Sequence, residues 1–97
     1  MTYKLIITPK ALKDINKATE YYFDIQKKLA KRFTKDLKNQ TKYILKKPTH
    51  IQVRYDNIRI AHLKKFPYSI HFTIEKQTII ILAIFNMAMN NEKWPKS

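Results

Sequence analysis

The stretch that decides the fold runs from Tyr68 to Phe85 and reads YSIHFTIEKQTIIILAIF. From Tyr68 to Ile74 apolar and polar residues alternate, which is the pattern of a strand with one buried face. From Thr78 onward the residues are continuously apolar and mostly β-branched, as expected of a central strand covered on much of both faces. The stretch therefore predicts two strands, at 68–74 and 78–85.

Two shorter strands are expected just upstream. After Pro48 the apolar residues recur at every second position from Ile51 to Tyr55. Asp56-Asn57 is a turn dipeptide, and the segment from Ile58 to Leu63 then reads as the returning strand.

The first half of the chain predicts one strand and two helices. Residues 2–7 favour a short strand. Thr8 followed by Pro9 is an N-cap with proline at the first helical position, and the helical spacing continues to about Asp24. A second amphipathic pattern covers residues 27–46 and ends before Pro48, which cannot continue a helix.

These elements give an α+β fold in the order β-α-α-β-β-β-β. The two helices should form a hairpin on one face of a mainly antiparallel sheet, within a single domain of residues 1–97. If Ile60, Ile70 and Phe72 face the helices, alternation points Arg59, Ser69 and His71 to the opposite, open face, together with Gln52 and Arg54. The functional site is expected on that open face.

Composition narrows the functional classes. The chain has no glycine, so it holds neither a P-loop nor a GxGxxG fingerprint, and it has no cysteine for disulfides or thiolate metal sites. We expect a soluble, cytoplasmic protein, because neither a signal peptide nor a membrane-spanning run is found.

Positive charge is concentrated in the second predicted helix. The chain has a net charge of +13, of which the segment from Lys27 to Lys47 contributes +8 with Asp36 as its only acid. This pattern indicates one of two things. The helix is an electrostatic surface that binds phosphates or an acidic protein, or it is an ordinary solvated helix face. The residues of this basic helix that we select are Lys27, Lys28, Lys31, Arg32, Lys35, Lys38 and Lys42.

A second group of cations lies on the predicted strands. Arg54 and Arg59 could converge with Lys64, Lys65 and His71 in a groove that binds phosphate; the alternative is ordinary polar decoration of the strands. Trp94 is either a stacking platform or an anchor for the tail, and Tyr68 is expected in the core.

Metal and cofactor sites are not expected. The three histidines and seven acidic residues show no metal-ligand spacing. Cleavage of RNA without a metal remains chemically feasible, because RNA supplies its own 2′-hydroxyl. Arg59, Lys65 and His71 would be the candidate catalytic residues.

The sequence resembles the RelE/ParE toxin superfamily of type II toxin–antitoxin systems over almost its whole length. The matching pieces are Tyr3, Thr8-Pro9, Ala11, Asp14-Ile15, Tyr21-Tyr22, Leu29–Phe33, Ile58–Ala61, Lys65–Ile70, Ile84-Phe85 and Trp94. The resemblance implies the fold described above and neutralisation by a small antitoxin, usually acidic. It also implies one of two activities: mRNA cleavage on the ribosome (RelE type) or block of DNA gyrase (ParE type).

Two departures favour the ParE type. Ser69 stands where RelE-like toxins place a catalytic arginine, and the tail from Asn86 to Trp94 lacks the His and Arg of a His-x-x-Arg-Asn-Pro-x-x-Trp motif. Losing two cations that act on the reacting phosphate leaves little nuclease activity. Arg59, which matches the family's strand arginine, and Trp94 are retained.

We therefore predict a ParE-like growth inhibitor of the plasmid-stabilisation kind, neutralised by a cognate antitoxin, with gyrase as its target and no cofactor. Two alternatives remain: a ribosome-dependent mRNA endonuclease, and a degenerate, non-toxic member that binds nucleic acid.

Overall fold

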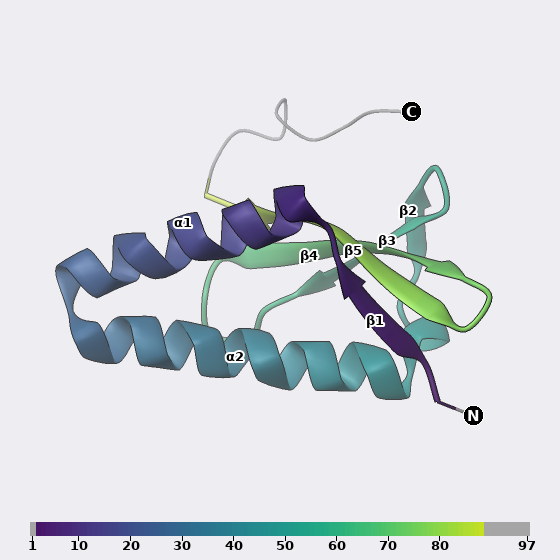
Figure 1. Ribbon diagram of the computed structural model, residues 1–97, viewed down its shortest axis with the longest axis horizontal. Helices are drawn as coiled ribbons and strands as arrows, with labels where there is room; N and C mark the ends of the chain where they lie inside the picture. Colours follow the sequence, from purple (N-terminus) through teal and green to yellow (C-terminus); the bar gives the residue numbers. More distant parts are fainter. Residues whose placement is uncertain (1, 89–97) are drawn as a thin grey trace.

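The computed structural model describes residues 2–88. The elements are β1 (Lys4–Ile7), α1 (Pro9–Ile25), α2 (Lys27–Lys46), the 3₁₀ helix η1 (Pro48–His50), β2 (Val53–Tyr55), β3 (Ile58–His62), β4 (Tyr68–Glu75) and β5 (Thr78–Asn86). The predicted α+β class and order of elements are confirmed (Figure 1). One local prediction is wrong: β2 begins at Val53 and not at Ile51, because Ile51 caps the 3₁₀ helix η1, which was not predicted from the sequence.

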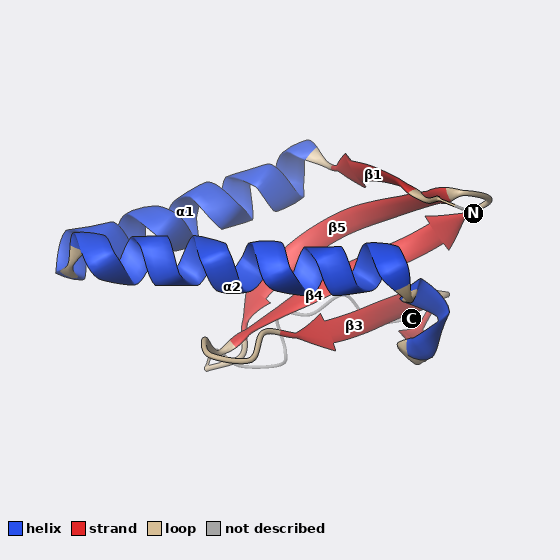
Figure 2. Ribbon diagram, turned by 90° about the horizontal axis from the view of Figure 1, so that it is seen from below, coloured by secondary structure: helices blue, strands red, loops and turns tan. Residues whose placement is uncertain are grey.

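The strands form one sheet in the order β1-β5-β4-β3-β2. β1 pairs with β5 in parallel, and all other neighbours are antiparallel. The two helices form an antiparallel hairpin, and α2 crosses one face of the sheet (Figure 2). The prediction of a helical hairpin on a mainly antiparallel sheet is therefore confirmed.

The core lies between α2 and the sheet, and aromatic rings form its centre. Phe33 of α2 is fully buried, with ring centroids 5.4 Å from Tyr22, 5.5 Å from Phe66 and 5.1 Å from Tyr68. The rings of the Phe66 and Tyr68 pairs meet edge to face, an arrangement that stabilises beyond simple burial. The expected place of Tyr68 in the core is confirmed.

A β-bulge in β5 determines how α1 is held. His71 pairs with Ala83 and Phe72 with Ile81, so Leu82 is an extra residue in β5. β1 pairs with β5 only as far as Ile81. The backbone of β5 beyond the bulge therefore lacks a strand neighbour on that side.

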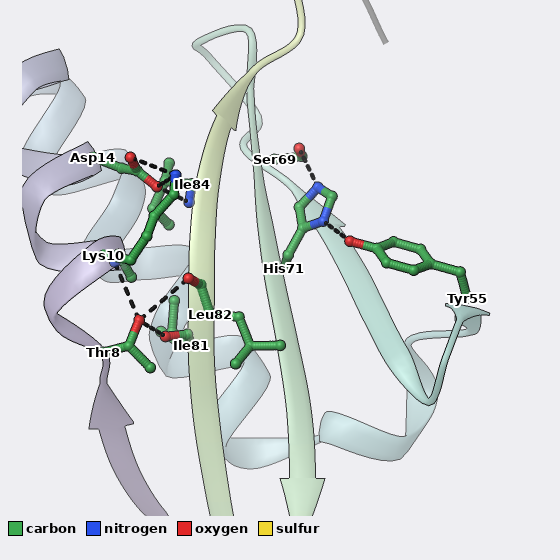
Figure 3. A network of polar contacts seen from close by, with 10 residues as sticks. Thr8, Lys10, Asp14, Tyr55, Ser69, His71, Ile81, Leu82 and Ile84 are labelled. Carbon is green, nitrogen blue, oxygen red and sulfur yellow. Dashed lines mark hydrogen bonds and ion pairs between the residues drawn. The ribbon is translucent and has the colours of Figure 1, made fainter. Parts of the chain in front are cut away.

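The start of α1 takes the place of that strand. The Thr8 hydroxyl accepts a hydrogen bond of 3.2 Å from the first turn of the helix, as the N-cap prediction required. It also lies 3.0 Å from the carbonyl oxygen of Ile81 and 3.2 Å from that of Leu82. Farther along α1, the Asp14 carboxylate accepts a 3.0 Å hydrogen bond from the Ile84 N–H (Figure 3). Two polar side chains thus attach the helix to the sheet.

We expect Asp14→Ala to lower the free energy of unfolding by about 1–3 kcal/mol, because it leaves the partly buried Ile84 N–H without its acceptor. Asp14→Asn retains an acceptor oxygen and should lose less. Lys10→Gln is the control, since it removes the exposed Lys10–Asp14 ion pair and the contact of Lys10 with the Phe85 ring but leaves the acceptor of the Ile84 N–H in place, and it should cost about 1 kcal/mol or less. Urea unfolding measures all three; equal losses for Asp14→Ala and Lys10→Gln would contradict this role.

The register of β3 differs from the prediction. Ile60 pairs with His71, and Arg59 pairs with Phe72. Directly paired residues of antiparallel strands share a face, so Ile60 lies on the His71 side and Arg59 on the side of the helices. Both alternating sets of β3 contain apolar residues, and the set that includes Ala61 joins the core. The prediction that Arg59 lies on the open face was therefore wrong, because the faces of β3 are exchanged relative to the predicted register. The predicted placement of His71 on that face was correct.

Turns in this glycine-free chain place other residues in the left-handed region. Asp56 and Asn57 have φ of 42° and 63°, as a two-residue hairpin turn requires, and the predicted turn is confirmed. Lys76, between β4 and β5, has φ of 55°. This conformation is costly for lysine, by about 1–2 kcal/mol.

Lys76→Gly should accordingly raise the free energy of unfolding by about 0.5–1 kcal/mol, because relief of the strain exceeds the entropic cost of glycine. The adjacent Gln77→Gly is the matched control and should lower stability, since Gln77 has no positive φ. Thermal unfolding of the two variants beside the parent decides; stabilisation by both, or by neither, would refute the strain argument.

Candidate functional site

A chain of three polar side chains occupies the sheet face opposite α2. His71 of β4 lies at its centre, with Nδ1 2.9 Å from the Tyr55 hydroxyl and Nε2 3.1 Å from the Ser69 hydroxyl (Figure 3). The ring of Phe85 contacts His71 edge-on at 4.6 Å between centroids. Strand alternation places Ser69 and His71 on one face, and the β2–β3 hairpin brings Tyr55 beside them.

Two of these three side chains are fully buried, and Tyr55 is partly buried. Ser69 is 0% and His71 1% exposed. Burial, followed by the nearby His62 and Lys10, lowers the pKa of His71 to about 4, and burial likewise raises the pKa of Tyr55. His71 is therefore neutral at pH 7. The expectation of an open sheet face is wrong at its centre, since the paired Ile60 is buried there as well.

This neutral, enclosed histidine is suited to holding strands together. Each ring nitrogen already has a hydroxyl partner. A phosphate outside the sheet has no route to it, and without a charge it attracts none. His71 therefore contributes no positive charge to the predicted phosphate-binding groove.

The two strand arginines lie on neighbouring strands, β2 and β3, at one edge of the sheet. Arg54 of β2 is exposed. Arg59 is partly buried, and its guanidinium donates a 2.6 Å hydrogen bond to the carbonyl oxygen of Ile51. Arg59 thus fixes the segment that follows η1, while Arg54 is free to meet a partner.

The two lysines lie at the other end of β3. Lys64 and Lys65 are exposed, and the Lys65 N–H donates to the carboxylate of Asp36 at 2.8 Å, which ties the loop to α2. β3 ends at His62, and the three steps from Arg59 to His62 already span about 10 Å of extended chain, so Lys64 and Lys65 follow the end of the strand that is far from Arg59. The predicted convergence of Arg54, Arg59, Lys64, Lys65 and His71 is not present. Trp94 lies outside the described residues.

The predicted basic helix, α2, contains more basic residues than any other described element. All its selected residues, from Lys27 to Lys42, are exposed. Asp36, the only acid in α2, is 6% exposed and faces the β3–β4 loop. Within residues 2–88 the ion pair found is Lys10–Asp14, so no α2 cation is neutralised by a carboxylate there. This charge is therefore available to an acidic partner.

Sequence reasoning missed the partners of three polar residues. Tyr55 was counted as an apolar strand residue, and Asp14 and Asp36 as scattered acids. In the structure each accepts or donates one specific hydrogen bond between elements. A lone acid inside an otherwise basic, amphipathic helix was the available signal for Asp36, because a carboxylate on a core-facing position needs a partner.

Neither a metal nor a membrane site emerges from the described residues. Between residues 2 and 88, no three His, Asp or Glu side chains are grouped so that they could hold a metal ion. No helix in this part of the chain has the length and apolar character needed to cross a membrane.

Comparison with known proteins identifies the family. The family model for the ParE toxin of the type II toxin–antitoxin system, parDE, matches residues 5–91. A solved structure of the chromosomal ParDE TA system from P. aeruginosa has a similar fold, with a TM-score of 0.76 and 23% identity, over 87% of this chain and 95% of that one. No curated protein matches the sequence. Because the family model spans most of its length, the chain belongs to the ParE toxin family of type II toxin–antitoxin systems.

Proposed function

We propose that this ParE-type toxin inhibits growth by blocking DNA gyrase and is neutralised by an acidic antitoxin encoded beside it. Family membership is the observation that carries the proposal. The net charge of +13 supports an acidic partner.

Exposed apolar side chains support a protein partner as well. Tyr21, Phe23 and Ile25 lie near the end of α1 and are 58%, 55% and 58% exposed. Ile6 of the edge strand β1 is 50% exposed. Clustered exposed apolar residues are typical of protein-binding surfaces, and we assign these to contacts with the antitoxin or the target.

Co-expression with the neighbouring small open reading frame tests the pairing. Induction of the chain alone should arrest growth, and the neighbouring protein should restore growth and co-purify with the chain. Phe23→Ser should weaken that co-purification, whereas Lys17→Ser, an exposed change on the same helix, should not. Growth without arrest would instead favour the degenerate, non-toxic alternative.

Supercoiling by purified gyrase tests the target. The chain should inhibit supercoiling. Arg54→Ala and Lys64→Ala each remove one exposed charge, Arg54 beside the start of β3 and Lys64 after its end. The variant that inhibits supercoiling less marks the end of β3 that contacts gyrase. Lys13→Ala, on the outer side of α1, is the control for charge alone. Unimpaired supercoiling at saturating chain would refute the gyrase target.

The nuclease alternative has less support from geometry. It needs Arg59, Lys65 and His71 around one phosphate, but His71 is 1% exposed and lies on the sheet face opposite Arg59. Primer extension on translated mRNA should therefore show no codon-phased cuts. Such cuts, if abolished by Arg59→Ala, would establish the nuclease instead.

A further inference from the structure

We propose that the outer face of α2 binds the phosphate backbone of double-stranded DNA without reading its sequence. The surface consists of six lysines, which we name the lysine row: Lys28, Lys31, Lys35, Lys38, Lys42 and Lys46. This activity is separate from the block of gyrase and does not depend on it.

The geometry of the helix aligns these six charges. They recur every three or four residues, and at 100° per residue they fall within about 80° of the helix circumference. All six are exposed, on the side of α2 away from Phe33, Leu37 and Ile44, which are buried in the core. The row is about 27 Å long at 1.5 Å per residue. It presents one straight line of positive charge.

Among residues 2–88, no acidic side chain forms an ion pair with this line. Asp36 is turned into the protein, where it accepts the Lys65 N–H at 2.8 Å. None of the ion pairs formed within residues 2–88 involves a lysine of the row. Six like charges at successive turns repel one another and destabilise the helix. A polyanion that binds there reduces this repulsion and so stabilises the helix.

The composition of the row favours phosphate over a protein partner. Protein interfaces are depleted in lysine and need apolar or aromatic anchors at their centre. The row consists of lysines alone, and Tyr43, which is 43% exposed on the same helix, lies about 60° of the helix circumference outside it. The group of exposed apolar residues Tyr21, Phe23 and Ile25 lies on α1, so the lysine row and this apolar group are on different helices of the hairpin.

The same composition favours duplex over single strands and argues against sequence reading. Single-strand binding relies on a series of aromatic platforms for stacking bases, whereas the row offers none and α2 exposes the single ring of Tyr43 outside it. Lysine acts on phosphate as a point charge, whereas base recognition commonly uses the bidentate fork of arginine. A straight row of about 27 Å matches roughly eight base pairs of rigid duplex, at 3.4 Å per base pair.

Fluorescence anisotropy with a labelled 20-base-pair DNA duplex and the full-length chain tests the proposal. The logarithm of the binding constant should fall linearly with the logarithm of salt concentration, with a slope of about −3.5 to −5.5 for four to six phosphate contacts. Duplexes of unrelated sequence should bind within about threefold of one another. A slope near zero, or a strong sequence preference, would overturn the proposal.

Matched variants assign the binding to the row. The triple change Lys31→Gln, Lys35→Gln and Lys38→Gln should weaken binding roughly 10²-fold at 100 mM salt and reduce the slope by about 3. The control removes three exposed lysines elsewhere: Lys4→Gln, Lys13→Gln and Lys17→Gln. It has the same net charge as the row variant and should bind much as the parent does; equal loss in both would show that net charge alone is responsible. The same three row positions changed to arginine should retain binding, which separates loss of charge from loss of fold.

Competition identifies the ligand class. Unlabelled DNA duplex should displace the probe, and poly-glutamate of equal charge should do so at least tenfold less well. If poly-glutamate competes equally, the row is a site for an acidic polypeptide and the proposal fails. It also fails if duplex RNA of the same length binds more than tenfold tighter than DNA.

Discussion

Phe33→Ala lowers the free energy of unfolding by about 3–5 kcal/mol, the largest single-residue effect we expect in this chain. Phe33 is 0% exposed, and its ring contacts those of Tyr22, Phe66 and Tyr68, all within 5.5 Å between centroids. Removing the ring deprives three neighbours of their common partner. Those neighbours come from a helix, a loop and a strand, so they cannot move together to fill the cavity.

The size of the chain makes this loss severe. Folded proteins typically have roughly 5–15 kcal/mol of stability in total, so the variant loses a large share of it. Chemical denaturation followed by circular dichroism measures the change as a shift in midpoint at constant slope. Phe23→Ala is the matched control, because that side chain is 55% exposed and its loss should cost under about 1 kcal/mol. Similar losses at the two positions would contradict the assignment of Phe33 to the core.

Acidification between pH 7 and pH 5 should destabilise the fold by about 2 kcal/mol through His71 alone. Burial lowers the pKa of His71 to about 4, whereas histidine in the unfolded chain titrates near 6.5. Below pH 6.5 the unfolded chain binds a proton that the folded chain does not. The stabilising contribution is complete above that pH and is lost as the pH falls towards 4.

The slope of stability against pH is the measurement. Near pH 5 it should reach about 1 kcal/mol per pH unit. His71→Gln stays neutral at every pH, so its profile should be flatter in this window even if its stability at pH 7 is lower. His50→Gln serves as the control, since His50 is exposed, and it should keep the parent slope. Parallel profiles for the parent and His71→Gln would show that His71 is not held neutral in the fold.

The sequence was sufficient to predict most of the helices, strands and turns. It was not sufficient to predict which side chains contact one another in the candidate site. The cap at Thr8, the turn at Asp56-Asn57 and the helix of 27–46 each depend on local rules, and each is confirmed. The face presented by Arg59 depends on which of two apolar sets in β3 enters the core, and only the pairing with β4 decides that. The partners of His71 and Asp36 come from other elements and leave no local trace in the sequence.

The parallel pairing of β1 with β5 has a consequence for synthesis on the ribosome. Lys4 lies opposite Thr78, and Thr8 and Asp14 bond to the backbone of residues 81–84. β1 therefore has no strand neighbour until β5 has emerged from the ribosome. A nascent chain stopped before Thr78 has an unpaired β1 and a loosely attached α1, so the native surface of this fold forms only after β5 has been synthesised.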